Sequence, residues 1–217
     1  MKNSDITSRI EQIVRQVIEE TLPPFGERTV PIGISARHMH ITQEHLEILF
    51  GPGATLTKMR DLTQPGEFAA NETVAVMGPN RRAFNALRIL GPTRNFSQIE
   101  LSYTDGIYLG MDLPHRISGD IKGSAPITVV GPKGVLRLPE GVIRAMRHVH
   151  MSPETAERFG LKPGDKIKVK AHGPAALTFD DVVVRTGKDL ILQMHVDTDE
   201  ANAAGLDRRG AFGEMIF

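Results

Sequence analysis

Residues 37–44, with the sequence RHMHITQE, recur 110 positions later as RHVHMSPE at residues 147–154. Both segments contain Arg-His-x-His, then an apolar residue, a hydroxyl residue, any residue and a glutamate. Because alternate residues of a strand project from the same face, each histidine pair can offer two imidazoles to one metal ion. The repeat therefore predicts two related halves, whose strand ends together hold two ions.

Four of the eight histidines lie in these repeats, namely His38, His40, His148 and His150. A single pair would favour a structural role, since strand-end histidines also cap helices or pair with glutamates, but the duplication favours metal binding. His195 is the next expected ligand, because it also ends an apolar strand ahead of a helix. The acidic cluster that follows it could instead form a calcium loop. Surface roles are expected for the other three, His45, His115 and His172.

The composition narrows the classes of function. The 217 residues suffice for one large domain or two small ones, and 26 basic residues balance 26 acidic ones, which argues against nucleic acid or an anionic membrane as the main partner. The lack of cysteine excludes disulfides and thiolate ligands, so any zinc must use nitrogen and oxygen. No apolar run approaches the roughly 20 residues of a membrane span, and no secretory signal is evident, so a cytoplasmic location is expected.

Beyond residue 26 the pattern changes to short strands punctuated by glycine-proline pairs. The expected strands span residues 30–36, 73–77, 83–90, 99–103, 107–109, 127–130, 135–138, 166–170, 177–184 and 190–195. Short helices are expected after Thr42 and Ser152, which are good N-caps, and from Asp197 or Thr198 to Gly205. Many strands with few, short helices favour barrels, so the expected fold class is mainly β.

Residues 1–22 differ from the rest of the chain. Apolar residues recur there at helical spacing, and a proline-rich linker follows, so residues 1–26 are expected to form an amphipathic helix and a linker. Two roles are open. The helix either docks on its own domain or acts as a detachable tag whose apolar stripe binds a partner protein.

Two zinc ions with five histidines need an oxygen ligand to give each ion three protein ligands. The candidates by composition are Glu44, Glu72, Glu100 and Glu154. Arg94 shortly precedes Glu100, and no nearby acidic residue obviously neutralises it. An arginine close to a metal pair suits a phosphate or carboxylate ligand, which its planar guanidinium binds bidentately; the alternative is a salt bridge within a loop.

A rival motif begins at the same histidines. The spacing of His38, His40, Glu44 and Gly51 resembles the first metal motif of cupins, a jelly-roll family with a single metal. The second half departs from that pattern, because residues 147–154 repeat the first motif where a cupin has one histidine at a different spacing. A cupin is therefore only the alternative.

Five segments in order resemble the phosphate propanoyltransferases, phosphotransacylases of bacterial microcompartments: residues 35–40, 61–69, 91–94, 147–153 and 194–203. The resemblance covers about residues 28–210, with no departure at a matched metal position. It implies a two-zinc enzyme that reversibly converts propanoyl-CoA or acetyl-CoA and phosphate to an acyl phosphate and coenzyme A. It also implies two β-barrels with short capping helices and crossed connectivity, in which residues 27–36 join 146–217 and residues 37–145 form the second barrel.

The family's motifs also assign roles to single residues. One zinc would be held by His38, His40 and Glu100, and the other by His148, His150 and His195. Arg94 matches the family's phosphate-contacting arginine, whereas Ser35, Arg88 and Asn202 fall where such enzymes contact coenzyme A. Residues 1–22 resemble the helix that targets members to the microcompartment lumen, where shell or cargo proteins would be partners. A homo-oligomer is also expected.

The expected mechanism is direct attack of metal-bound phosphate on the thioester, because the chain has no cysteine to form a covalent intermediate. Two other classes of function stay open. One is a metal-dependent hydrolase that uses the same zinc pair on water. The other is a non-enzymatic microcompartment adaptor, in which zinc would be purely structural.

Overall fold

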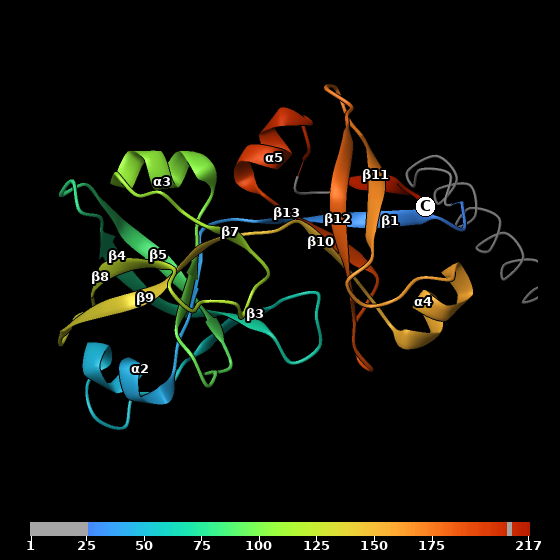
Figure 1. The fold of residues 1–217 in the computed structure, drawn as a ribbon. Helices are drawn as coiled ribbons and strands as arrows, with labels where there is room; N and C mark the ends of the chain where they lie inside the picture. The colour runs from blue at the N-terminus through green and yellow to red at the C-terminus, as the bar shows by residue number, and fades with distance from the viewer. Residues whose placement is uncertain (1–25, 208–209) are drawn as a thin grey trace, which may run out of the picture.

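The computed structural model describes residues 26–207 and 210–217, and in this part of the chain strands greatly outnumber helices. The amphipathic helix predicted for residues 1–22 lies outside the described residues. Two closed barrels of six strands each lie side by side and are joined by two extended connections (Figure 1). The mainly β fold class and the two crossed barrels predicted from the sequence are confirmed.

The first barrel, called the C-terminal barrel, closes in the order β1, β13, β10, β12, β11, β14. Its strands are β1 (Thr29–Ser35), β10 (His148–Met151), β11 (Lys166–His172), β12 (Thr178–Thr186), β13 (Gln193–Asp197) and β14 (Phe212–Ile216). The first strand of the described residues, β1, is thus built into a barrel made otherwise from the last part of the chain.

The second barrel, called the central barrel, closes in the order β9, β6, β2, β5, β4, β8. Its strands are β2 (His38–His40), β4 (Phe68–Met77), β5 (Ala83–Gly91), β6 (Gln98–Glu100), β8 (Ala125–Val130) and β9 (Val135–Ala145). Two short strands extend this sheet, β3 (Lys58–Asp61) beside β4 and β7 (His115–Arg116) beside β9.

Each strand of one barrel has a counterpart in the other. The parallel pairs β2–β5 and β6–β9 correspond to β10–β12 and β13–β1, and every other neighbouring pair in both rings is antiparallel. In this correspondence β1 takes the place of β9. The strand that closes each barrel therefore leads directly into the H-x-H strand of the other barrel, and this explains the crossed connectivity (Figure 1).

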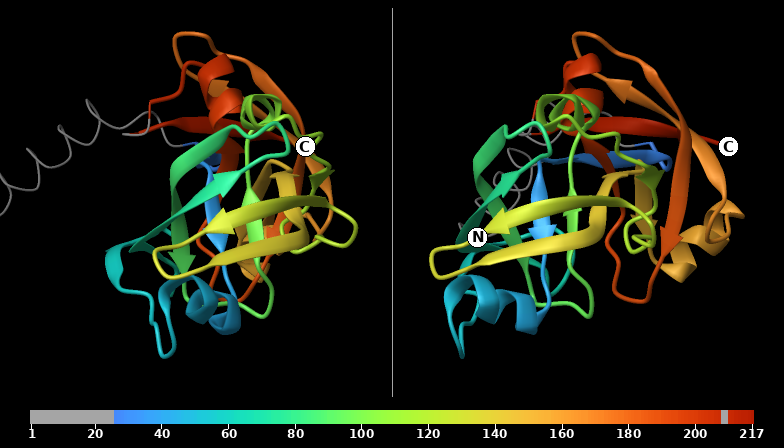
Figure 2. Two further views of the ribbon diagram at one scale, coloured as in Figure 1. Left: turned by 90° about the vertical axis from the view of Figure 1, so that its left-hand side faces the viewer. Right: turned by 60° about the vertical axis from the view of Figure 1, so that its left-hand side comes forward.

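Four described helices follow strands of the two rings, and their labels are α2 (Gln43–Phe50), α3 (Tyr103–Leu109), α4 (Pro153–Phe159) and α5 (Thr198–Ala203). The predicted N-caps are confirmed, since the hydroxyls of Thr42 and Ser152 accept hydrogen bonds from the first turns of α2 and α4. The helices α3 and α5 follow β6 and β13, and both begin with a capping box. In Figure 2 the helices lie at the ends of the barrels.

Side chains alternate along the two H-x-H strands, so the middle residue and the two histidines of each strand project to opposite faces. Met39 and Val149, the middle residues of the two H-x-H motifs, are fully buried in the cores of their barrels. Since side chains alternate along a strand, the flanking histidines project to the outer face of each barrel. His38 and His40 are nevertheless buried there, with exposed fractions of 7% and 5%, so this outer face is covered.

Two sequence predictions of secondary structure are wrong. The strand predicted at residues 107–109 is part of α3, and the strand predicted at 99–103 ends at Glu100. The reason is the capping box, in which Ser102 accepts a hydrogen bond from the Asp105 backbone and starts a helix within an apolar run. The strand expected at 190–195 is displaced to β13, while β3, β7 and β14 were not predicted at all.

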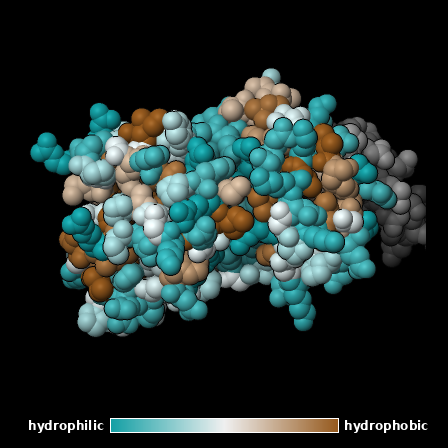
Figure 3. All heavy atoms as spheres, in the orientation of Figure 1, coloured by the Kyte–Doolittle hydropathy of each residue, from teal (hydrophilic) through white to brown (hydrophobic). Residues whose placement is uncertain are grey.

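The surface is mixed in character. In the view of Figure 3, hydrophilic residues predominate, and the hydrophobic ones form small separate patches over both barrels. On α3, Tyr103, Ile107 and Tyr108 are exposed. Among the described residues, no helix is both long enough and apolar enough to cross a membrane.

Candidate metal centre

The central half-site consists of His38 and His40 from β2 and Glu100 from β6. Because β2 and β6 are antiparallel with His38 opposite Glu100, the third residue lies directly beside the first. His38 Nε2 is 3.5 Å from a carboxylate oxygen of Glu100. One donor atom from each of the three residues lies within 4.8 Å of the other two, so the group could hold a metal ion.

The C-terminal half-site consists of His148 and His150 from β10 and His195 from β13. Here His195 lies opposite His148 in the same antiparallel register, and their rings stack with centroids 5.1 Å apart. The donor atoms of these three histidines also lie within 4.8 Å of one another. The two half-sites are therefore built by equivalent strands, with a carboxylate in one and an imidazole in the other.

Hydrogen bonds orient several of these rings. The Nδ1 atoms of His38 and His148 lie 2.8 and 2.9 Å from the backbone carbonyls of Ala36 and Met146, which are equivalent positions of the two repeats. His195 Nδ1 lies 3.3 Å from the hydroxyl of Ser35. The carbonyl contacts of His38 and His148 require a proton on Nδ1 and leave Nε2 to face a metal, the usual arrangement around metal-bound histidine.

Three other ring nitrogens are buried without a hydrogen-bond partner among the described residues: His40 Nδ1, His150 Nδ1 and His195 Nε2. Buried polar atoms are nearly always paired, so a cluster of unpaired ones requires an explanation. A cation bound between these rings would accept their lone pairs. The residues present thus fit a bound metal ion in both half-sites.

Protonation states also suit metal binding. Burial, followed by the charges of neighbouring residues, lowers the pKa of His40 to about 2 and those of His150 and His195 to about 3. Burial likewise lowers the pKa of His148 to about 4. Burial opposes ionisation of Glu100, but electrostatic interaction with His38 and a hydrogen bond from Ser118 bring its pKa below the ordinary value. Neutral imidazoles and an ionised carboxylate are the forms that bind metals.

The two half-sites adjoin. A small cavity of about 20 Å³ is lined by residues of both, including Glu100, His148 and His195, together with Ser35. Glu100 also acts electrostatically on His148 and His195 across the boundary between the barrels. The histidine pairs that lie 110 residues apart in the sequence thus form one centre.

Two arginines flank this centre. Arg94 lies in the loop between β5 and β6, and its guanidinium donates a 2.7 Å hydrogen bond to Glu67. This is the loop salt bridge that the sequence left open as the alternative for Arg94; its partner was not evident because Glu67 lies 27 residues earlier and comes close through the folding of the loop before β4. The positive charge of Arg94 also lowers the pKa of His40.

Arg185 is the second arginine, and sequence reasoning missed it. It lies on β12 opposite His150 in the parallel register, and burial lowers its pKa. Its charge lowers the pKa values of His150 and His195. The available signal was a single charged residue directly after the buried apolar run Val182, Val183 and Val184.

The residues assigned to coenzyme A lie at different distances from the metal ligands. Ser35 contacts His195 directly, as described above. Arg88 lies beside His38 in the parallel register, but its guanidinium donates to the carbonyls of Ala70 and Asn71. Asn202 is exposed on α5.

The other three glutamates considered as oxygen ligands lie outside the two half-sites. Glu44 and Glu154 are exposed in the first turns of their helices, and Glu72 accepts hydrogen bonds from Thr57. The acidic cluster after His195 is used in helix capping, since Asp197 and Glu200 form the capping box of α5, and this removes the calcium-loop alternative.

The remaining histidines lie apart from the metal ligands. His115 and His172 are exposed, as expected. His45 is half-buried and lies 2.7 Å from the Ser97 hydroxyl, so the surface role expected for it is wrong.

Two crossed six-stranded barrels that share paired histidine clusters define a double-barrel protein with a candidate two-metal centre. The family model described as phosphate propanoyltransferase matches residues 31–207. The chain belongs to this family and is accordingly an acyltransferase, a phosphotransacylase. A cupin, which has one metal in a jelly roll, is excluded by both the family and the second barrel.

Curated relatives agree with the family model. A phosphate propanoyltransferase of Lachnoclostridium phytofermentans is 51% identical over 200 residues, covering 91% of this chain and 93% of the relative. One of Planctopirus limnophila is 53% identical over 176 residues, covering 81% and 72%. One of Thermotoga maritima is 45% identical over 213 residues and covers 98% of both chains.

Proposed function

We propose that this acyltransferase uses two zinc ions to interconvert acyl-CoA plus phosphate with acyl phosphate plus coenzyme A, with propanoyl-CoA or acetyl-CoA as substrate. The observation that carries the proposal is the pair of adjoining ligand clusters flanked by two arginines, in a chain of the phosphate propanoyltransferase family. The names of the relatives favour the propanoyl group.

The donor set supports zinc. Five imidazoles and one carboxylate, with no thiolate, match the nitrogen and oxygen ligands of catalytic zinc, and three protein ligands per ion leave a position open. Zinc bound there would supply positive charge that holds phosphate and polarises a thioester carbonyl.

Arg94 and Arg185 support binding of phosphate between them. A guanidinium binds phosphate oxygens bidentately, and half-buried arginines bind them more strongly than exposed ones because less water screens the charge. Glu67 holds Arg94 in place through the 2.7 Å ion pair. Phosphate oriented in this way approaches the thioester with its charge reduced, which assists attack.

The reaction then needs no enzyme nucleophile. A phosphate oxygen forms a bond to the thioester carbonyl carbon, the bond from carbon to sulfur breaks, and coenzyme A leaves as a thiol after taking the proton of the phosphate. The chain contains no cysteine that could form a thioester of its own. Direct attack is thus the simplest course.

Ser35, Arg88 and Asn202 are proposed to contact coenzyme A. The contact of Ser35 is supported by its place in the lining of the small cavity between the half-sites, where its hydroxyl would lie near the thioester. The exposed Asn202 on α5 and Arg88 on β5 would contact more distant parts of the ligand.

The location and assembly of the protein are also proposals. Residues 1–22 would direct it to the lumen of a microcompartment by binding shell or cargo proteins through their apolar stripe. Exposed apolar residues on α3 support a homo-oligomer. Residues 27–36 with 146–217, and residues 37–145, are the two units that we propose as domains.

The test combines zinc analysis of the purified protein with an assay of thiol release from acetyl-CoA and propanoyl-CoA. We expect two zinc ions per chain and a rate that requires added phosphate. Thiol release without phosphate would instead indicate a hydrolase. Zinc with no thiol release would indicate an adaptor, and less than one zinc per chain with no release would reject the proposal.

A further inference from the structure

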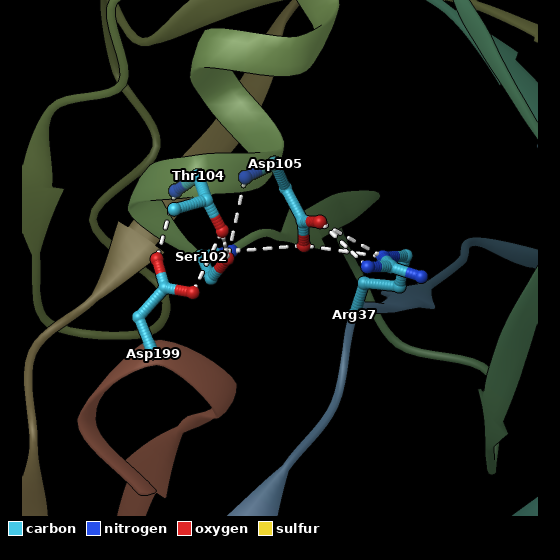
Figure 4. Close-up of polar contacts among 5 residues, drawn as sticks. All are labelled: Arg37, Ser102, Thr104, Asp105 and Asp199. Atoms are coloured by element: carbon cyan, nitrogen blue, oxygen red, sulfur yellow. Dashed lines mark hydrogen bonds and ion pairs between the residues drawn. The ribbon is translucent and has the colours of Figure 1, made fainter. Parts of the chain in front are cut away.

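The arginine that begins each R-H-x-H repeat is not a metal ligand, and its repetition needs its own explanation. Arg37 forms an ion pair with Asp105, the third residue of α3 (Figure 4). Its Nε is 3.1 Å from both carboxylate oxygens and its Nη2 is 2.7 Å from one of them. Asp105 is almost completely buried, and its carboxylate also accepts from the Ser102 backbone in the capping box.

Arg147 makes the equivalent contact in the other half. Its Nη1 donates a 2.8 Å hydrogen bond to Glu200, the third residue of α5. Glu200 in turn accepts from the Asp197 backbone in its own capping box. Each repeated arginine therefore binds the carboxylate that caps the helix directly after the strand with the third metal ligand.

Both arginines also contact the strand on the other side of the H-x-H strand. The guanidinium of Arg37 lies 4.2 Å from the ring centre of Phe84 on β5, and that of Arg147 lies 5.7 Å from that of Phe179 on β12. These two strands are the parallel neighbours of β2 and β10. Each arginine thus links the helix after the third-ligand strand to the strand on the other side of its own H-x-H strand.

One further contact joins the two halves. Asp199 on α5 accepts hydrogen bonds from the backbone and the hydroxyl of Thr104 on α3, at 2.8 and 2.7 Å (Figure 4). The Thr104 hydroxyl lies 3.2 Å from that of Ser102, the N-cap of α3. Since Asp199 is adjacent to Glu200, the contacts run from one repeated arginine to the other through the start of both helices.

We propose that Arg37 and Arg147 are positioning residues, each of which holds the third metal ligand of its own half-site in place, and that Asp199 fixes the two half-sites relative to each other. The proposal rests on the proposed two-metal centre. Arg37 would act on Glu100 through the start of α3, and Arg147 on His195 through the start of α5.

The physical reason is that metal affinity depends on small displacements of the ligands. Loss of the Arg37 guanidinium would leave the buried Asp105 carboxylate with only the Ser102 backbone as partner, so the start of α3 would move to hydrate its charge. Glu100 ends the strand that leads into this helix and would move with it. Loss of a group that is hydrogen-bonded directly to a ligand changes metal affinity by about 10-fold to 100-fold, so an effect transmitted through the start of α3 should lie at the lower end of that range.

The test measures zinc affinity of one half-site at a time, by competition with a chromogenic chelator. His40→Ala leaves the C-terminal half-site, and His150→Ala leaves the central one; the Nδ1 atoms of both rings have no hydrogen-bond partner among the described residues. Into each background we would introduce Arg37→Lys or Arg147→Lys. Lysine keeps the charge but not the paired hydrogen bonds.

We expect Arg37→Lys to weaken zinc binding about 10-fold in the central half-site and to leave the C-terminal half-site unchanged, with the opposite pattern for Arg147→Lys. Asp199→Asn should weaken both half-sites by a similar factor, and its thermal unfolding must match that of the parent, because an equal loss with lowered stability would remove Asp199 from the proposal. Lys166→Gln is the matched control, because it removes an exposed ion pair to Asp181 on the C-terminal barrel.

Equal affinities in the parent and the arginine variants would overturn the inference, even if the parent binds two ions. An equal loss at both half-sites for Arg37→Lys would also overturn it, because a general loss of stability would act on both. Absence of zinc from the parent would instead reject the proposed metal centre. If Arg37→Lys does not fold, as judged by thermal unfolding, Asp105→Asn tests the same ion pair with its shape retained.

Discussion

In the central half-site the residue opposite the first histidine is Glu100, and in the C-terminal half-site the equivalent position is His195. The strand order, the register and the backbone contacts of the first histidine are the same in both. With a divalent ion in each, the carboxylate would leave a formal charge of +1 at one half-site and +2 at the other. The duplication thus supplies the geometry, whereas a single ligand sets the charge.

The flanking arginines differ more than the ligands. Arg94 lies in a loop and is paired with Glu67, while Arg185 lies on a strand and has no equivalent partner in any described hydrogen bond or ion pair. They do not occupy equivalent positions of the repeat. The proposed binding of phosphate between the half-sites would therefore be a property of the assembled pair, not of either barrel.

The largest expected effect comes from removing one ligand from either half-site. His40→Ala and His150→Ala should each lose one zinc per chain and lower turnover on the order of 10³-fold, because a metal contributes several kcal/mol to such a reaction. Emission spectroscopy measures the zinc content, and the thiol-release assay measures the turnover. His172→Ala, an exposed histidine stacked on Phe212, is the control. Full activity of either ligand variant would show that one half-site suffices.

A smaller loss is expected from the two arginines. Arg94→Ala and Arg185→Ala should keep both zinc ions, raise the KM for phosphate and lower kcat about 100-fold, as for loss of one charge-stabilising donor. Steady-state kinetics with varied phosphate separate the effect on KM from the effect on kcat. Arg137→Ala, an exposed arginine on the central barrel, serves for comparison. Unchanged kinetics would remove the altered arginine from the mechanism.

Making the half-sites alike tests the charge difference directly. Glu100→His should keep two zinc ions, since imidazole is also a zinc ligand, but should lower kcat about 10-fold through the altered charge and geometry. Zinc analysis establishes that the metal is retained before kcat is compared. A variant as fast as the parent would mean that the difference between the half-sites has no role in the rate.

The smallest effect concerns the contact between the barrels rather than the ligands. The buried Gln64 amide donates to the Ile191 carbonyl at 3.1 Å and accepts from the Ile191 backbone at 3.0 Å, thereby joining the loop before β4 to the segment before β13. Gln64→Ala should reduce the free energy of unfolding by about 1–3 kcal/mol. Urea unfolding would measure this loss of stability. Gln43→Ala is the control, because the hydrogen bonds of the Gln43 side-chain amide are exposed. Equal stabilities would show that the contact contributes nothing.

Much of the local structure was predictable because its causes are local. Alternation of apolar residues located most strands, and the hydroxyl residues Thr42 and Ser152 located two helix starts. The same reasoning failed at α3, where Ile107 and Leu109 lie in an apolar run that fits a strand as well as a helix. The capping box decided between them, and its signal is only the spacing of Ser102 and Asp105.

The candidate site was predictable in part. The repeat identified four histidines, and the strand pattern added His195, but composition left four glutamates open as the oxygen ligand. Only the resemblance to the family selected Glu100, and the structure places it opposite His38. Arg185 and the partner of Arg94 escaped because both depend on contacts between segments far apart in the chain.

The sequence by itself determined the H-x-H pairs, their common face and the start of the helices behind them, since strand alternation and helix capping act within a few residues. Only the tertiary structure decided that β1 completes the distant barrel, that Glu100 and His195 face the histidine pairs, and that Arg37 and Arg147 bind the helices beyond. Strand pairing and buried ion pairs depend on which surfaces exclude water together, and the folded chain as a whole sets this.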